Sequence, residues 1–307
     1  MFTVRRAFDA PPAATRYLPT EAWHARQGRH HERADALLAP HRARQQRGEA
    51  HPVWDFLFTY YSLRPAQLRR WHPGIGTALE NAPDHARWRG YRTDEQGLTD
   101  VSPEFIEHRA STVRFVLDLI ERTTARPARL SCFGMHEWAM VYRTSPEEVR
   151  HARLPLRLGH DGTDAVVESM PLRCTHVDAY RFFTEAARPR NDQVLTRADQ
   201  LRAEQPGCVH ASMDLYKWCY KLLPITSSNL LLDCFELALA AREIDMRASP
   251  YDLSGHGLAP IAVESPGGRA EYVRLQQWLA GRAAPLRERI AAACQASLAA
   301  LAAAGPA

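Results

Sequence analysis

Lysine is nearly absent from this sequence. Of 39 lysines and arginines among 307 residues, only Lys217 and Lys221 are lysines, and both lie in the aromatic-rich segment GCVHASMDLYKWCYKLLP, residues 207–224. Arginine is the usual partner in structural ion pairs, and this chain uses it almost everywhere else. Two lysines in one short segment therefore favour a functional site over a purely structural ion pair.

Other absences narrow the class of protein. The sequence has no run of about 18 or more apolar residues, which excludes a membrane-spanning helix. Its first 17 residues contain no apolar segment typical of a secretory signal. Six scattered cysteines form no C-x-x-C pair, which indicates reduced thiols rather than disulfides. We expect a cytoplasmic protein with no membrane partner.

The pattern of apolar residues predicts a mainly α protein with a small β insert (α+β). Helical periodicity predicts helices over 102–126, 207–223, 228–247 and 266–304. Short apolar runs separated by turn residues predict strands around 154–183. We expect a single, mostly helical domain over 51–307, with a basic helical segment at 1–50 before it.

The segment 1–50 carries nine arginines against five acidic residues. It predicts a polar, exposed helix over 20–48, interrupted at Pro40. A basic surface of this kind suits nucleic-acid phosphates, although arginines on a solvated helix face have the same composition.

One polar stripe runs along the predicted helix at 207–223. Positions i, i+4, i+7 and i+11 share a helix face, and here they are His210, Asp214, Lys217 and Lys221. The rest of the helix is apolar, so we expect burial on most sides and a stripe that faces a cleft or partner charges. The next helix has a similar stripe, and we expect the lysines to meet Asp233, Glu236 or Glu243 there. Such a network either fixes helix register or shifts pKa values for acid–base chemistry.

A second cluster is typical of metal ligands. In CTHVDAYRFF, residues 174–183, His176 and Asp178 share a face if the segment is a strand. With His210 they match a site of two histidines and one carboxylate for iron or another divalent metal. In CFGMHEWAMVYR, residues 132–143, His136 and Glu137 are adjacent, so we expect at most one to reach a given site.

The turn in QLRRWHPGIG, residues 67–76, is similar to the hairpin of helix–hairpin–helix proteins. Gly74 and Gly76 would let backbone N–H groups approach a DNA phosphate, with Arg69 and Arg70 adding charge-assisted contacts. The alternative is an ordinary packing turn.

Five strings together resemble an actinobacterial family labelled 3-methyladenine DNA glycosylase. They are HPVWDFLFTYYSLRPAQLRRWHPG, CFGMHEWAMVYR, CTHVDAYRFF, QPGCVHASMDLYKWCYKL and DMRASPYDL, and the resemblance spans roughly residues 20–285. It implies a DNA-repair hydrolase that cleaves the N-glycosidic bond of an alkylated purine, in DNA or a purine nucleoside, without a cofactor.

Three hypotheses follow. For a glycosylase, a carboxylate must stabilise positive charge on the sugar and a second group must activate water or protonate the base. The candidate catalytic residues are His210, Asp214, Lys217 and Glu236, and the candidate substrate-binding residues are Trp138, Tyr216, Lys221, Gly74, Gly76, Arg69 and Arg70. The second hypothesis is a metal-dependent oxidoreductase or hydrolase of the non-haem iron type that uses His176, Asp178 and His210. The third is a non-catalytic binding protein.

Overall fold

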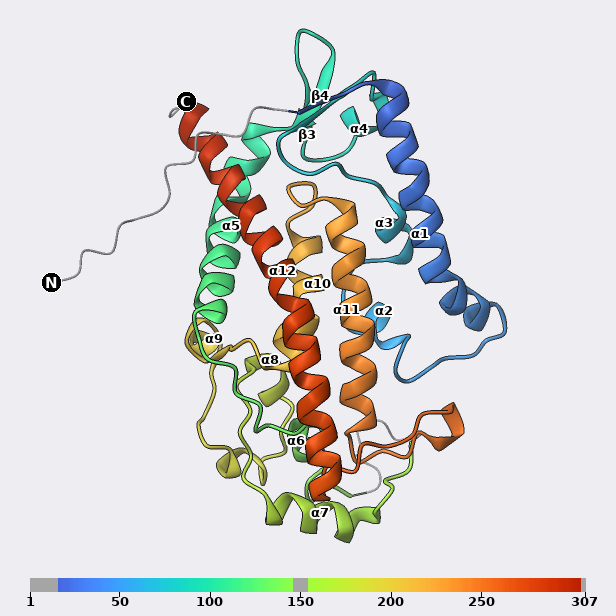
Figure 1. Ribbon diagram of the computed structural model, residues 1–307, viewed down its shortest axis with the longest axis vertical. Helices are drawn as coiled ribbons and strands as arrows, with labels where there is room; N and C mark the ends of the chain where they lie inside the picture. The colour runs from blue at the N-terminus through green and yellow to red at the C-terminus, as the bar shows by residue number, and fades with distance from the viewer. Residues whose placement is uncertain (1–15, 146–153, 305–307) are drawn as a thin grey trace, which may run out of the picture.

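The body of the protein is formed by helices that pack against one another (Figure 1). A computed structural model describes residues 16–145 and 154–304. The helices are α5 (Pro103–Thr124), α10 (Val209–Lys221), α11 (Ser228–Arg247) and α12 (Pro266–Ala304). Helix α12 packs against α5, α10 and α11, and α10 and α11 pack closely on each other. The predicted class, mainly α with a small β insert, is confirmed.

Local sequence accounts for the ends of these helices. The side chain of Ser102 accepts a hydrogen bond from the backbone N–H of Phe105, and Pro103 occupies the first turn of α5. Ser227 caps α11 in the same way through Leu230. Helix α11 is buried on most sides, which explains its long apolar runs.

The sheet lies at one end of the helical body (Figure 1). Strands β1 (Arg16–Leu18), β2 (Thr77–Glu80), β3 (Tyr91–Thr93) and β4 (Leu98–Val101) are ordered β1-β2-β4-β3. Strand β1 is parallel to β2, and the other pairs are antiparallel.

The strands predicted around 154–183 are therefore misplaced. Residues 159–169 form α7 (Gly159–Ser169), and α8 (Val177–Tyr180) follows. Only single bridges occur in this stretch, between Leu156 and Tyr251 and between Leu172 and Asn191. Short apolar runs do not distinguish strand from helix, and Thr163, Val166 and Val167 are buried at helical spacing.

Helix α1 (Thr20–Gln46) also differs from its prediction, because it runs through Pro40 and buries one face. That face packs on the rest of the chain, notably α3 (Pro65–Arg69) and α11. Its buried residues are Trp23, His30, Ala34, Leu38 and His41. Pro40 is exposed, so water can satisfy the carbonyl that lost its partner. Residues 16–46 are part of the same packed unit, and the first 15 residues of the predicted basic segment lie outside the described residues.

Four short helices complete the structure: α2 (Phe56–Tyr60), α4 (Pro83–Ala86), α6 (Met135–Ala139) and α9 (Gln200–Ala203). Three 3-10 turns cover Arg188–Arg190, Arg197–Asp199 and Ser254–His256. None of the helices within 16–145 and 154–304 is long and apolar enough to cross a bilayer.

Candidate metal centre

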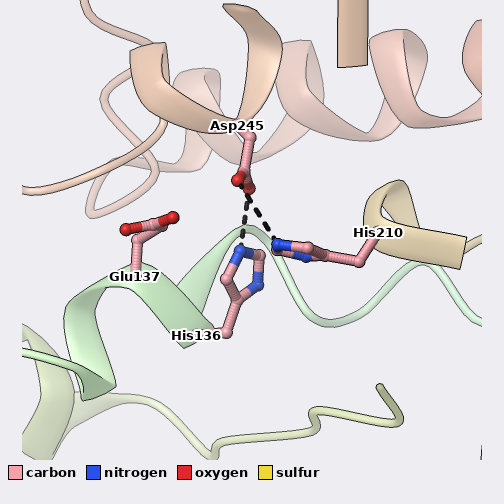
Figure 2. Close-up of side chains that lie close together, drawn as sticks. All are labelled: His136, Glu137, His210 and Asp245. Atoms are coloured by element: carbon pink, nitrogen blue, oxygen red, sulfur yellow. Dashed lines mark hydrogen bonds and ion pairs between the residues drawn. The ribbon is translucent and has the colours of Figure 1, made fainter. Parts of the chain in front are cut away.

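Four side chains from three helices converge in the core (Figure 2). His136 and Glu137 come from α6, His210 from the first turn of α10, and Asp245 from the last turn of α11. One ligand atom from each lies within 4.8 Å of the others, and all four residues are at most 8% exposed. Two imidazoles and two carboxylates are a donor set that suits iron, manganese or zinc.

The approach of α6 to α11 depends on a left-handed turn. Phe133 and Gly134 have φ values of 50° and 72° just before α6. A Cβ on Gly134 would lie 3.2 Å from the Cβ of Ala248, so only glycine permits this close approach without displacement. The indole Nε1 of Trp138 then donates to the carbonyl of Ala248 at 2.9 Å. This docking aims His136 at Asp245.

His136 and Glu137 both reach the cluster, although at most one was expected to do so. Their side chains leave the backbone in different directions and approach from two sides (Figure 2). The prediction failed because the site lies between the two directions and the glutamate side chain is long enough to turn into it.

Arg242 forms hydrogen bonds with the carboxylates of both Glu137 and Asp245. Its Nη1 donates to Oε1 of Glu137 at 3.0 Å and to Oδ2 of Asp245 at 3.3 Å. The guanidinium carbon lies 3.8 Å from the centroid of the Phe56 ring, and the residue is 1% exposed. Its Nε and Nη2, and Oε2 of Glu137, have no hydrogen-bond partner among the described residues. These buried polar groups are therefore only partly satisfied, and Oε2 of Glu137 retains lone pairs that can bind a cation.

The charges within the cluster shift the pKa values of its members. Burial acts to raise the pKa of Asp245, but His136, His210 and Arg242 together hold it well below its usual range. Burial acts to lower the pKa of His136, but the charge and hydrogen bond of Asp245, at 2.8 Å from Nε2, raise it well above the ordinary value. The pKa of His210 is lowered by burial and by the neighbouring His136 and His176. A neutral His210 retains a free lone pair for a metal ion.

A second cluster of polar side chains lies beside the candidate metal ligands. The His176 ring stacks on His210 with centroids 5.2 Å apart, and its Nε2 lies 3.2 Å from Oδ2 of Asp214. Lys217 donates to Asp214 and, at 3.1 Å, to Asp178. The hydroxyl of Tyr61 donates to the other oxygen of Asp214 at 2.8 Å. Both carboxylate oxygens of Asp214 are therefore engaged.

Three members of the predicted stripe, His210, Asp214 and Lys217, are buried as expected. Lys221 is exposed at the end of α10, where its Nζ lies 5.4 Å from the centroid of the Trp218 ring. The expected pairing of the lysines with the stripe of α11 is wrong for Lys217, which pairs within its own helix and with α8.

Glu236 is not part of the site. It pairs with Arg33 of α1, and Asp233 pairs with both Arg33 and Arg289. The surfaces of α10 and α11 that face each other are apolar, with the Tyr216 and Phe235 rings 5.2 Å apart. The acidic stripe of α11 therefore faces α1 and α12.

The structure does not bring the three predicted metal ligands together in one cluster. His210 does belong to the cluster, but His176 binds Asp214 and Asp178 binds Lys217. His176 precedes α8 and Asp178 lies within it, so the strand geometry that would have aligned them does not exist.

The predicted substrate-binding residues do not form one site. Trp138 and Tyr216 are fully buried core residues. The turn at Gly74 and Gly76 joins α3 to strand β2, so it does not lie between two helices as the hairpin requires. Ile75 within it donates its N–H to the carbonyl of Ile225.

The two arginines before this turn also have partners in the fold. Arg69 forms an ion pair with Asp35, and the guanidinium of Arg70 lies over the Trp88 ring. The structure thus supports the packing alternative for this turn.

Two cavities of about 10 Å³ adjoin His210, each the size of one water molecule. The first cavity is lined by aromatic rings and by charged side chains from both clusters. These residues include Phe56, Tyr60, Glu137, Asp178, Phe182 and Arg242. The second contains the thiols of Cys132, Cys174 and Cys208 beside His136 and His176. The first cavity joins the candidate metal ligands to Asp178, a carboxylate next to Lys217.

No protein-family model, curated protein or solved structure matches this chain. The resemblance to a glycosylase family therefore stays a prediction. The function must be inferred from the geometry of the site.

Sequence reasoning missed His136, Glu137, Arg242 and Asp245 as a group. One signal was present: Arg242 and Asp245, three residues apart, stand at buried positions of the apolar helix α11. Charged residues at buried positions need partners, and those partners were the histidine and glutamate after Gly134.

Proposed function

We propose that this protein is a metal-dependent enzyme, an oxidoreductase or hydrolase, with His136, Glu137, His210 and Asp245 as ligands of one divalent iron, manganese or zinc ion. The observation that carries the proposal is the convergence of two imidazoles and two carboxylates within 4.8 Å in the core. A bound ion polarises an oxygen of its substrate or activates a water molecule.

The surroundings of the cluster support this assignment. Glu137 and Asp245 are two carboxylates beside a single guanidinium, which leaves one excess negative charge that favours a bound cation. Without an ion, the same balance requires a proton on His136, whose pKa is raised. The cluster thus favours a cation or a proton among its ligand atoms.

The first cavity gives the reacting group a place beside the ion. Glu137, His210 and Asp178 all line this cavity, which has the size of one water molecule. Lys217 and burial act on Asp178 in opposite directions, and the net effect lowers its pKa, so it is ionised at neutral pH. An ionised carboxylate at this position can accept a proton from a substrate or water.

Metal content of the purified protein tests the proposal. We expect about one equivalent of iron, manganese or zinc in chains purified without chelator from metal-supplemented medium. His210→Ala and Asp245→Ala should lose it. The control is His85→Gln, which changes a fully buried histidine hydrogen-bonded to the Trp71 carbonyl, far from the cluster.

Absence of metal from the wild type, together with no binding of Fe(II), Mn(II) or Zn(II) in titration, would refute the proposal. The cluster would then be a buried ion-pair network. Release of alkylated purine from DNA by metal-free protein would favour the glycosidic reaction instead.

A further inference from the structure

A cleft of about 360 Å³ opens on the outside of the protein, away from the buried cluster. It lies where α1 meets the start of α11 and the middle of α12. Its lining is almost entirely cationic or polar: Arg26, Arg29, His30, Arg33, Asn229, Asp233 and Arg289. The volume is within the range of small-molecule sites, which is roughly 300–1,000 Å³.

The charges of this arginine cleft do not cancel. Arg33 is paired with Asp233 and Glu236, and Arg289 shares Asp233. Among the described residues, neither Arg26 nor Arg29 forms an ion pair. Four guanidinium groups thus face two carboxylates, which leaves a surplus of two positive charges.

Neighbouring arginines repel the guanidinium of Arg26. Burial lowers the pKa of Arg26, and the positive charges of Arg16 and Arg29 lower it further. His30 adds no charge, because burial lowers its pKa to about 4. A dianionic group would relieve the repulsion, and guanidinium forks match the geometry of phosphate oxygens.

A second, more open cleft of about 650 Å³ adjoins the first and shares Asp233 and Arg289 with it. Its wall includes Trp278, which is 45% exposed, with the guanidinium of Arg282 lying 5.0 Å from the ring centroid. Trp278 and Arg289 are about three helical turns apart on α12, which is about 16 Å along the axis. An exposed indole beside an arginine is a stacking surface for a planar base.

We propose that the joined clefts bind a nucleotide, with its phosphates among Arg26, Arg29 and Arg289 and its base against Trp278. The site shares no residue with the metal cluster, so we assign the ligand as an effector. The same chemistry occurs at the end of a nucleic acid strand, and the test separates the two sources.

Isothermal titration with ATP and with tripolyphosphate tests the proposal. We expect both to bind, and Arg26→Gln/Arg29→Gln to weaken both by about tenfold or more, because each charge-assisted contact to phosphate contributes at least that factor. Trp278→Ala should weaken ATP but leave tripolyphosphate unchanged. Arg274→Gln, an exposed arginine on α12 outside both clefts, is the matched control.

Three results would overturn the proposal. They are no binding of ATP at millimolar concentration, equal binding by the arginine double variant, and tighter binding of a single-stranded oligonucleotide that strengthens with its length. The last result would indicate a nucleic-acid track. His210→Ala should bind ATP like the wild type, so failure of the metal assignment leaves this test intact.

Discussion

Nε2 of His136 lies 2.8 Å from Oδ1 of Asp245, although 109 residues separate them in the chain. This contact joins the short helix α6 to the last turn of α11 and places two candidate metal ligands side by side. Because both groups are buried, the contact also contributes to folding, and its two roles can be separated by experiment.

Asp245→Asn should lower the free energy of unfolding of metal-free protein by about 3 kcal/mol, because it leaves His136 without its buried carboxylate and Arg242 with Glu137 as its one buried carboxylate. Asp233→Asn, on the same helix but in a partly exposed ion pair, should cost about 1 kcal/mol or less. Urea unfolding at pH 7 measures both. Equal losses would show that the buried network adds no special stability.

Lys217→Met should destabilise the protein by about 3 kcal/mol, since Asp178 and Asp214 would lose their shared cation. Lys221→Met, at the exposed end of the same helix, should change stability by about 0.5 kcal/mol or less. Chemical denaturation of the two variants compares them directly. A similar small effect at both positions would contradict the paired role of Lys217.

Gly134→Ala should reduce both stability and metal content. The alanine would adopt an unfavourable positive φ and press on Ala248, which displaces α6 and its two ligands. Gly97→Ala is the control, because Gly97 has φ of 79° but open space around it. We expect about 1 kcal/mol for the control and a larger loss at Gly134. Unchanged metal content in Gly134→Ala would show that α6 tolerates displacement.

Because His72 is buried, we expect the free energy of unfolding to fall in mild acid. Burial, with His85 and Arg70 nearby, lowers its pKa to about 3 from an ordinary 6.5. The unfolded chain therefore binds a proton between these values and the folded chain does not, so stability falls as the pH drops below 6.5. From pH 7 to pH 5 this one group should cost about 2 kcal/mol.

Urea unfolding of wild type and His72→Gln at pH 7 and pH 5 measures this contribution. The variant should lose about 2 kcal/mol less than the wild type over this interval. An identical pH dependence of the two proteins would show that His72 is not the group responsible.

The long helices could be predicted because the information for them is local. Residues 228–247 and 266–304 were predicted with the bounds that the structure has, since an apolar periodicity runs through each and Ser227 or Pro266 starts it. The sheet could not be placed, because its strands are only three or four residues long and β1 pairs with a distant strand, Arg16 lying opposite Thr77 of β2.

For the site, the sequence by itself determined that α10 carries buried polar side chains. Because the helix is apolar on its other sides, His210, Asp214 and Lys217 needed partners within the fold. The tertiary structure alone decided the partners. Lys217 faces Asp178 rather than Glu236, and His210 faces Asp245 and His136 rather than Asp178. Helical spacing specifies which residues share a face, but only the packing of α6 and α8 against α10 and α11 determines what that face meets.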